Sequence, residues 1–435
     1  MSDPRYEAYK ILLKIEKDHS YSVLSVTEAL KSVEFADARD TSFVVSLVYG
    51  VLERKITLDY NIGLYLSTPI KKIKPNVLIL LRIGAYQIMY MDKIPDRAAV
   101  NESVSLSKNI GAGYASGLVN AILRKISVNG SLYPEKNDSE KYLSVSYSIN
   151  LDIVKSMISD YGLQKTESVL DCFFGRRPVF IRCNLLKCSV EKLVELLENA
   201  NVNVELTDIP GCLKIDNSGD ITKLEAFKNG MFYVQDMSSQ LCCLLAGVTP
   251  GVNVVDCCAA PGGKSFTMAQ YLQGKGSIVS CDVHPHKKQL LEEGAKRLGI
   301  ENLTVVCSDA RVLNKTFSNA DVVLCDVPCS GFGVMGRKPE IRYKKSEDFE
   351  QLPSLQYEIL SSCSEIVKPG GTLLYSTCTL NKRENDLVCD KFLIEHPDFT
   401  ISLDCEYQKY SDRYITVFPE NEGGDGFFIA KFTRC

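Results

Sequence analysis

Apolar residues recur at helical spacing through roughly the first 126 residues of the chain. Two clear runs are Val44, Val45, Val48, Val51 and Leu52, and Ile79, Ile83 and Ile88. A spacing of three and four residues places these side chains on one face of a helix. The pattern predicts an all-helical module from Tyr6 to about Ile126. The polar stretch that follows contains Gly130, Pro134 and Asn137, which predicts a linker over residues 127–140.

Two further patterns follow this module. Residues 151–170 are predicted to be helical, RRPVFIRCN a strand, SVEKLVELLENA a helix, and VNVELTDI and GCLKID two strands, which together form a small α+β unit. From about Asn229 strands alternate with helices, which predicts a mainly parallel sheet with crossover helices. A chain of 435 residues is long enough for such a division. We expect domains at 1–135, 136–235 and 236–435.

Charge and hydropathy exclude some classes of protein. The longest apolar stretch, VLILLRIGAYQIMYM, contains Arg82 and is shorter than the ~20 residues that span a bilayer. MSDPRYEAYK lacks the apolar region of a signal peptide, so we expect a cytoplasmic protein with no membrane segment. Residues 1–130 hold 17 Lys and Arg against 13 Asp and Glu. This slight excess is compatible with phosphate contacts, although a solvated surface gives the same imbalance.

The cysteine pattern favours free thiols. All 17 cysteines lie from Cys172 onward, their number is odd, and none are paired as C-x-x-C. A large chain without an export signal keeps such thiols reduced, and structural zinc sites use closely spaced pairs. We therefore expect neither disulfides nor a metal.

The segment GVNVVDCCAAPGGKSFTMAQYL predicts a buried strand, a tight turn and a helix. Ligands of open α/β sheets bind at the carboxyl ends of such strands. A phosphate-binding loop would require glycine where the chain has Cys258, and G-x-G-x-x-G is absent. The turn is therefore predicted to admit a cofactor that lacks phosphate.

Two carboxylates follow the next strands. Asp282 ends the strand GSIVSCD, where a carboxylate can accept hydrogen bonds from both ribose hydroxyls of a cofactor. Asp309 follows LTVVCS and would face an adenine amino group. Each has an alternative role as a cap of the helix or turn that it precedes.

Two thiols follow the last predicted strands. Cys329 lies in DVVLCDVPCSG and Cys378 ends KPGGTLLYSTCTL, after a Pro-Gly-Gly turn. A single cysteine at a strand end is usually core filler. Because these two strands are expected to be neighbours, both thiols should face one pocket. The Asp/Asn-Pro-Pro-aromatic sequence of amino-group methyltransferases is missing.

A thiol at such a pocket suits methylation of cytosine at carbon 5. Attack of a thiolate on carbon 6 converts the ring into an enamine that can take the methyl group. Asp326 is positioned to donate or share a proton with ring nitrogen 3, and a base must later remove the carbon-5 proton. No catalytic role is assigned to the four histidines, which are His19, His284, His286 and His396.

Several motifs together carry a family resemblance. CCAAPGGKS, CDVHPHK, SDAR, DVPCSGFGVMGRKPEIRY, LQYEIL, YSTCTLNKREN and GGDGFF resemble, in order and spacing, the bacterial ribosomal RNA small-subunit methyltransferase B family of cytosine-5 enzymes. The helical front resembles the NusB-like RNA-binding domain of that family, and the middle unit its RNA-recognition-like insert. The resemblance implies a class I S-adenosylmethionine methyltransferase fold, with a Rossmann-like, mainly parallel sheet.

The resemblance also implies roles for residues. Cys378 is the implied nucleophile, Cys329 assists release of the product, and Lys264 lies near the active centre with Asp326. The implied cofactor contacts are Cys258, Ala259, Ala260, Pro261, Gly262, Gly263, Lys264, Asp282, Asp309 and Asp326. Arg337, Lys338, Pro339 and Glu340 stand where the family commonly has Arg-His-Pro-Asp.

We therefore expect a monomeric enzyme that methylates carbon 5 of a cytosine in 16S ribosomal RNA, with S-adenosylmethionine as cosubstrate. Two alternatives remain open. The same chemistry can act on another rRNA cytosine or on transfer RNA, because the front domains choose the target. The chain can also be an RNA-binding protein with a vestigial catalytic domain, although that alternative predicts eroded motifs.

Overall fold

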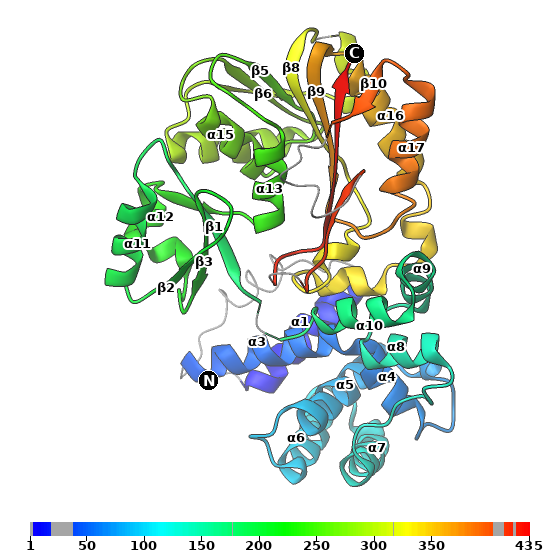
Figure 1. Ribbon diagram of the computed structural model, residues 1–435. Helices are drawn as coiled ribbons and strands as arrows, with labels where there is room; N and C mark the ends of the chain where they lie inside the picture. The colour runs from blue at the N-terminus through cyan, green and yellow to red at the C-terminus, as the bar shows by residue number, and fades with distance from the viewer. Residues whose placement is uncertain (1–2, 19–37, 176, 316, 403–412, 421–422) are drawn as a thin grey trace. The chain divides into compact units, whose positions relative to one another are not determined.

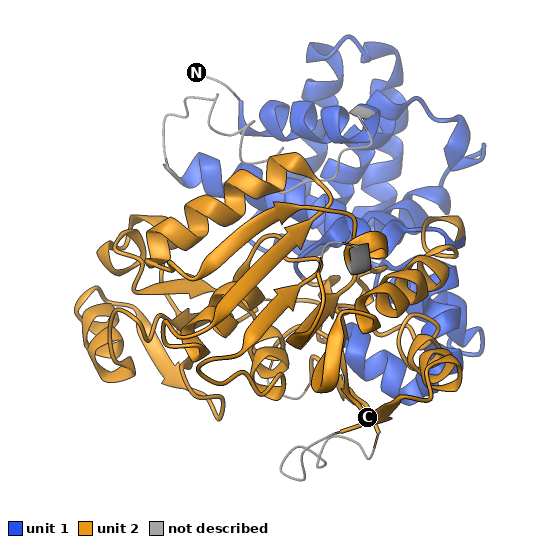
Figure 2. Ribbon diagram, turned by 90° about the horizontal axis from the view of Figure 1, so that it is seen from above, with its two compact units in different colours: residues 1–171, 337–346 blue, residues 172–336, 347–435 orange. Residues whose placement is uncertain are grey.

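The computed structural model describes residues 3–18, 38–175, 177–315, 317–402, 413–420 and 423–435. Two compact units divide the chain (Figure 2). The first contains residues up to Asp171 together with Arg337–Ser346, and the second contains Cys172–Gly336 and Glu347–Cys435. The domain limits expected from the sequence stay a prediction.

The first unit is helical, as the apolar spacing predicted. Its α-helices are α1 (Pro4–Asp18), α3 (Ala38–Glu53), α4 (Lys55–Gly63), α5 (Pro75–Tyr90), α6 (Asp96–Asn109), α7 (Ser116–Asn129), α8 (Ser139–Ser146), α9 (Leu151–Tyr161) and α10 (Leu163–Asp171) (Figure 1). Short 3-10 turns lie at Ile70–Lys72, Gly113–Ala115 and Pro339–Tyr343. The predicted linker is shorter than expected, because α7 runs to Asn129 and α8 begins at Ser139.

Helix α5 shows how this unit buries its most apolar segment. It begins with proline at its first position, where the missing N–H costs no helical hydrogen bond. Arg82, which interrupts its apolar run, is buried and donates to both oxygens of Asp59 at 2.7 and 2.8 Å. A buried guanidinium needs such a paired acceptor. Across the described residues, no helix combines the length and apolar character that crossing a bilayer requires.

Residues 337–346 pack within the helical unit although they interrupt the second unit in sequence. Arg342 is fully buried there, and its Nη1 donates to the Tyr147 carbonyl at 3.1 Å. The Asn150 N–H donates to the Arg342 carbonyl at 2.7 Å. The backbone N–H of Lys55 donates to the Tyr343 hydroxyl at 3.2 Å. The motif GRKPEIRY therefore contributes its second half to the core of the helical unit.

The second unit begins with a small antiparallel sheet, as predicted. Its strands are β1 (Val179–Cys183), β2 (Asn203–Leu206), β3 (Cys212–Asp216) and β4 (Phe232–Val234), in the order β2-β3-β1-β4. Helices α11 (Val190–Asn199) and α12 (Glu225–Lys228) cover one face of this sheet. Ser189 caps α11 by accepting from the Lys192 N–H at 3.2 Å.

An eight-stranded sheet forms the rest of the second unit, and it is parallel in its centre as predicted. The order is β10-β12-β9-β8-β5-β6-β7, with β11 paired to β12. The strands are β5 (Asn253–Asp256), β6 (Ser277–Asp282), β7 (Leu303–Cys307), β8 (Ala320–Asp326), β9 (Val367–Thr377), β10 (Phe399–Ile401), β11 (Ile415–Val417) and β12 (Phe427–Arg434). Strands β10, β11 and β12 add antiparallel pairs at one side.

Helices cover both faces of this sheet (Figure 1). Val254 and Leu324 pack in a core with α13 (Met237–Leu245), α14 (Gly263–Tyr271) and α15 (Pro285–Leu298). Val255 and Val323 point to the other face, against α16 (Leu352–Ser364) and α17 (Asp386–Glu395). Burial on both faces explains why these strands are continuous apolar runs.

The predicted turn at Pro369–Gly371 lies inside a strand instead. β9 runs from Val367 to Thr377, and its pairing with β8 jumps from Ala320–Val367 to Val322–Thr372. The extra residues form an irregularity in which Gly370 has φ +75°. The glycines therefore serve a bulge, and the strand still ends next to Cys378 as expected.

Candidate active site

A pocket of about 570 Å³ opens at the carboxyl ends of the central strands. Seven of the residues predicted from the sequence line it: Cys258, Ala260, Asp282, Asp309, Asp326, Cys329 and Cys378. Ala259, Pro261, Gly262, Gly263 and Lys264 lie in the same turn but outside the lining. The volume lies within the range of pockets for small ligands and cofactors.

The turn after β5 depends on glycine at one position. Gly262 has φ +110° and precedes the first residue of α14. A Cβ built on it would meet the Phe266 ring at 2.4 Å, so a side chain is excluded on steric grounds as well. The compact turn brings Cys258 and Ala260 to the pocket wall.

Asp282 ends β6 and Asp309 follows β7, and these strands lie on the opposite side of β5 from β8 and β9. The two carboxylates therefore line one end of the pocket, and each has a local partner. Asp282 accepts from the His284 N–H at 3.0 Å and from Lys287 Nζ at 3.3 Å. Asp309 accepts from the Arg311 N–H at 2.9 Å and from Arg311 Nη2 at 2.6 Å. The hydrogen bonds from the Arg311 side chain lower the pKa of Asp309. Both carboxylates therefore line the pocket, as expected. Both also cap the turn that follows them, which was the alternative role.

Sequence reasoning missed several lining residues. Lys287 and Arg311 lie within CDVHPHK and SDAR, and a base two to five residues after a strand-end carboxylate is the signal that was available. Leu355 and Ile359 of α16 supply an apolar wall opposite these charges. They lie within the motif LQYEIL, but their place at the pocket was not predicted, because α16 reaches the pocket only once the sheet has formed.

Cys329 and Cys378 meet at the other end of the pocket, as the strand order predicted. Their sulfur atoms are 3.3 Å apart, although the residues are 49 positions apart in sequence. The hydrogen bond with Cys378, together with burial, raises the pKa of Cys329 well above its ordinary value. Two thiols at this distance share a single reactive centre.

Lys264 and Asp326 form an ion pair beside the thiols. Lys264 Nζ donates to Asp326 Oδ2 at 2.6 Å, and the Ser376 hydroxyl donates to Oδ1 at 2.7 Å. Burial opposes the charge on Lys264, but Asp326 outweighs this effect and raises the pKa of Lys264 above its ordinary value. The lysine is therefore a cation in the folded protein, and Asp326 is held in one orientation by two donors.

Asp256 lies behind the turn and is almost fully buried. It accepts from the Ser265 hydroxyl at 2.6 Å, and the Ser280 hydroxyl donates to Ser265 at 2.8 Å. Burial raises the pKa of Asp256 to about 7, although the hydrogen bond from Ser265 opposes this change. Its contacts tie the end of β5 to the first turn of α14.

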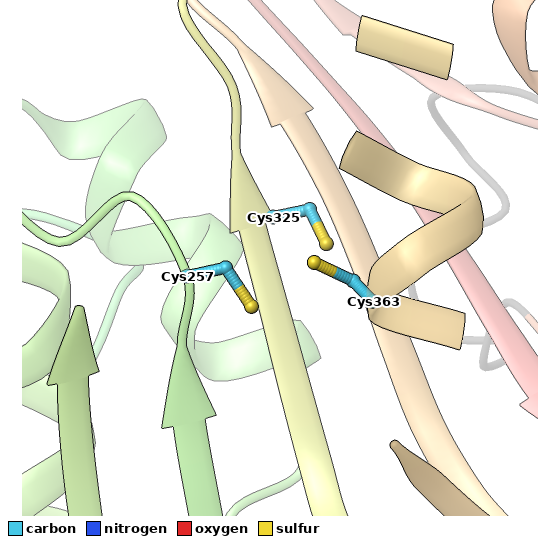
Figure 3. A group of neighbouring side chains, drawn as sticks. All are labelled: Cys257, Cys325 and Cys363. Carbon is cyan, nitrogen blue, oxygen red and sulfur yellow. The ribbon is translucent and has the colours of Figure 1, made fainter. Parts of the chain in front are cut away.

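Three buried cysteines lie close together, and one of them, Cys257, lines the pocket (Figure 3). Cys257 follows β5, Cys325 lies on β8 and Cys363 on α16, and their sulfur atoms lie within 4.8 Å of one another. Structural zinc sites use four ligands, and the group found among the described residues supplies three. The expectation that no metal is bound stays a prediction.

The pocket has the features that an adenosine-type ligand requires. Asp282 and Asp309 offer carboxylate oxygens for hydroxyl and amino groups, and Val283, Leu355 and Ile359 offer apolar contacts for a planar base. The thiols lie at the far end, where the reactive group of such a ligand would be. The residues therefore fit S-adenosylmethionine by their chemistry.

Family comparisons match nearly the whole chain. A family described as 16S rRNA methyltransferase RsmB/F matches residues 244–433, the NusB family matches residues 2–128, and a ferredoxin-like domain of RsmF/B-like methyltransferases matches residues 153–222. The probable ribosomal RNA small subunit methyltransferase B of Bacillus subtilis is 36% identical over 98% of this chain and 98% of its own length. The protein of the same name from Synechocystis sp. is 32% identical over 100% of both chains.

Solved structures agree on the fold. PH0851 has a TM-score of 0.82 and 25% identity, covering 100% of this chain and 99% of its own. NSun6 from Pyrococcus horikoshii, solved with SFG, has a TM-score of 0.58 over 64% of this chain and 97% of its own, and at 21% identity this shows likeness of fold alone. The predicted NusB-like, small α+β and Rossmann-like parts are confirmed. The chain belongs to the 16S rRNA methyltransferase RsmB/F family.

Proposed function

We propose that this protein transfers a methyl group from S-adenosylmethionine to carbon 5 of a cytosine in 16S ribosomal RNA. The observation that carries the proposal is the pair of thiols, Cys329 and Cys378, 3.3 Å apart at one end of the pocket. Amino-group methylation needs no thiol, whereas carbon-5 methylation of a pyrimidine needs a covalent nucleophile and a base. Family membership and the cofactor-like end of the pocket support the same reaction.

The sequence division gives each part a role in this reaction. Residues 1–135 would bind RNA as a NusB-like domain, residues 136–235 would add an RNA-recognition-like surface, and residues 236–435 would carry out the chemistry. The matches of the NusB family to residues 2–128 and of the ferredoxin-like domain to residues 153–222 support this assignment.

In the first step the Cys378 thiolate attacks carbon 6 of the cytosine. A carbon–sulfur bond forms, the ring double bond opens toward carbon 5, and ring nitrogen 3 gains a proton or a strong hydrogen bond. S-adenosylmethionine would supply the electrophilic methyl group at carbon 5. The target base must leave the RNA stack to reach the thiols.

Asp326 and Lys264 would provide the polar contacts at ring nitrogen 3. The Asp326 carboxylate is held by Lys264 Nζ and by the Ser376 hydroxyl, so its orientation is fixed before the base arrives. Fixed dipoles of this kind stabilise developing charge without reorganising. Asp326 would pass a proton from Lys264 Nζ to the ring nitrogen, because Lys264 donates to Asp326 Oδ2 at 2.6 Å.

Cys329 would complete the reaction. Once the Cys329 thiol has lost its proton to solvent, its thiolate accepts the proton from carbon 5. The carbon–sulfur bond to Cys378 then breaks, its electron pair returns to that sulfur, and ring nitrogen 3 gives back the proton that it gained in the first step. The short distance between the two sulfur atoms supports this exchange, because both must reach adjacent carbons of one ring.

The test is to incubate the protein with methyl-labelled S-adenosylmethionine and unmodified small-subunit rRNA, and to digest the RNA to nucleosides. The proposal predicts label in 5-methylcytidine. Label on another base would contradict the chemistry. Transfer RNA as a second substrate tests the target: if only transfer RNA is labelled, the chemistry holds and the proposed substrate is wrong. If no RNA is labelled, the RNA-binding alternative replaces the enzyme.

A further inference from the structure

Glu384 is a fully buried carboxylate that none of the steps above uses. It follows Cys378 by six residues, in the loop before α17. Its Oε2 accepts from the Ser330 N–H at 2.8 Å and from Gln356 Nε2 at 2.9 Å, and its Oε1 accepts from Asn381 Nδ2 at 2.9 Å. All three donors are uncharged. A carboxylate withdrawn from water is costly, and these hydrogen bonds offset that cost only if all of them are kept.

The donors hold the loop that carries Cys329 on both sides of the thiol. Ser330, which donates to Glu384 directly, is the next residue after Cys329. Gln356 donates from the same Nε2 to the carbonyl of Pro328, the residue before Cys329, at 2.9 Å. Gln356 Oε1 has no hydrogen-bond partner within the described part of the chain. The two hydrogen bonds from Nε2, to Glu384 and to the Pro328 carbonyl, therefore set the orientation of this amide. Glu384 and Gln356 therefore fix the backbone around Cys329.

The same network reaches the loop of Cys378. The Ser330 and Thr379 hydroxyls are 2.7 Å apart, and the Gly333 N–H donates to the Cys378 carbonyl at 3.0 Å. Asn385 Nδ2 donates to the Thr379 carbonyl at 2.9 Å. The two cysteine-bearing loops are thus joined through buried hydrogen bonds, and Glu384 is the acceptor at which three of these bonds meet.

We propose that Glu384 is a positioning residue that locks the Cys329 loop against the Cys378 loop, and so assigns attack to Cys378 and product release to Cys329. The inference rests on the function proposed above. It adds a specific reason why two thiols at one pocket have different roles.

The negative charge of Glu384 also distinguishes Cys329 from Cys378, because it raises the pKa of Cys329. The hydrogen bond with Cys378 and burial are the main causes of the raised pKa of Cys329, and the negative charges of Cys378, Glu384 and Asp326 raise it further. The Lys264 ammonium group is paired with Asp326 at 2.6 Å. Tyr375 donates to the Glu384 carbonyl at 2.6 Å. Cys329 is therefore kept as a thiol while Cys378 attacks, and its thiolate is a stronger base when the carbon-5 proton has to be removed.

The first test compares Glu384→Gln with the wild type. The substitution keeps the shape, removes the charge and points an amide N–H at one of the present donors. We expect the first methyl transfer to persist, release to slow by about tenfold or more, and a covalent protein–RNA adduct to accumulate on a denaturing gel. Glu395→Gln, on an exposed residue at the end of α17, is the matched control and should turn over normally. Turnover of Glu384→Gln at the wild-type rate, or loss of the first transfer without an adduct, would overturn the proposal.

A second test needs neither RNA nor cofactor. In a Cys378→Ser background, Cys329 is alkylated with iodoacetamide over a range of pH and its modification is followed by peptide mass spectrometry. Adding Glu384→Gln should move the midpoint of the alkylation profile to lower pH, since a negative charge near the thiol has been removed. A loosened loop alone would raise the rate at every pH with the midpoint unchanged, and that result would overturn the proposal. If the midpoint moves but wild-type protein methylates no RNA, the proposed function fails and the positioning of Cys329 stands.

Discussion

The two ends of the pocket are built in different ways. At the cofactor end, Asp282 and Asp309 are held by residues two to five positions further along the chain. At the reactive end, the contacts Cys329–Cys378, Lys264–Asp326 and Ser330–Glu384 join residues 49, 62 and 54 positions apart. The cofactor end is therefore a set of separate turns, whereas the reactive end exists only when the whole sheet is closed. Substitutions at the reactive end should therefore have larger effects on activity, and the effects of combined substitutions should be less additive there.

The largest effect is expected for Cys378→Ala. Removing the proposed nucleophile would leave no path to the covalent intermediate, so methyl transfer should fall by at least about 1,000-fold. Incorporation of labelled methyl into RNA measures this loss. Cys307→Ala, at an exposed cysteine, is the matched control and should behave as the wild type. Transfer at the wild-type rate by Cys378→Ala would rule out this residue as the nucleophile.

Lys264→Met should have the next largest effect. It leaves the Asp326 carboxylate without its cation and removes the proton source at ring nitrogen 3. We expect kcat to fall by about 100-fold, within the usual contribution of general acid–base catalysis, while the affinity for S-adenosylmethionine changes little. Kinetics and calorimetry on the same preparation separate the two quantities. A loss of affinity with unchanged kcat would move Lys264 from the reactive end to the cofactor end.

Asp282→Ala should have the opposite effect: the affinity for S-adenosylmethionine should fall, while kcat changes little. Hydrogen bonds to charged groups contribute about 1.5–3 kcal/mol, so the affinity for S-adenosylmethionine should fall by roughly 10- to 100-fold. Asp309→Ala should weaken binding less, because Asp309 is more exposed than Asp282 and already held by Arg311. Isothermal titration calorimetry measures both variants. Equal affinity of Asp282→Ala and the wild type would mean that the ribose contact lies elsewhere.

The smallest effect concerns stability rather than activity. Burial raises the pKa of Asp256 to about 7 from its ordinary value of 3.8, so between these pH values the folded protein keeps a proton that the unfolded chain releases. Its contribution to stability is therefore greatest below about pH 4 and is lost as pH rises toward 7, with a slope of at most about 1.4 kcal/mol per pH unit. Asp256→Asn removes this dependence. Melting temperatures of both proteins at pH 5, 6 and 7 should converge or cross as pH rises, and parallel curves would contradict the assignment.

The sequence predicted the parts of the fold that depend on local pattern. Helical spacing identified the first unit, and alternating strands and helices identified the parallel sheet, because burial of one face or of two faces leaves a period in the chain. The Pro369–Gly371 segment was predicted as a turn and is a bulge within β9, since glycine and proline mark both features. The packing of residues 337–346 in the helical unit left no local signal.

In the candidate site, too, the features with a local sequence pattern were predicted and the others were not. Cys329 and Cys378 were brought together correctly because they follow neighbouring strands. The Asp282 and Asp309 turns were also visible, since capping chemistry is local. Gln356 and Glu384 lie within the motifs LQYEIL and YSTCTLNKREN, but no role was predicted for either, because only burial between two distant loops gives it one. The gathering of Cys257, Cys325 and Cys363 similarly requires three separate elements.

The most direct test of the central claim uses Cys329→Ala with unmodified small-subunit rRNA and S-adenosylmethionine. If Cys378 attacks and Cys329 releases, this variant should transfer the methyl group once and remain joined to the RNA, giving a band that survives denaturing electrophoresis. Mass spectrometry of the digested adduct should place the methylated cytosine on Cys378. Free methylated RNA produced over many turnovers, with no adduct, would contradict the division of work between the two thiols.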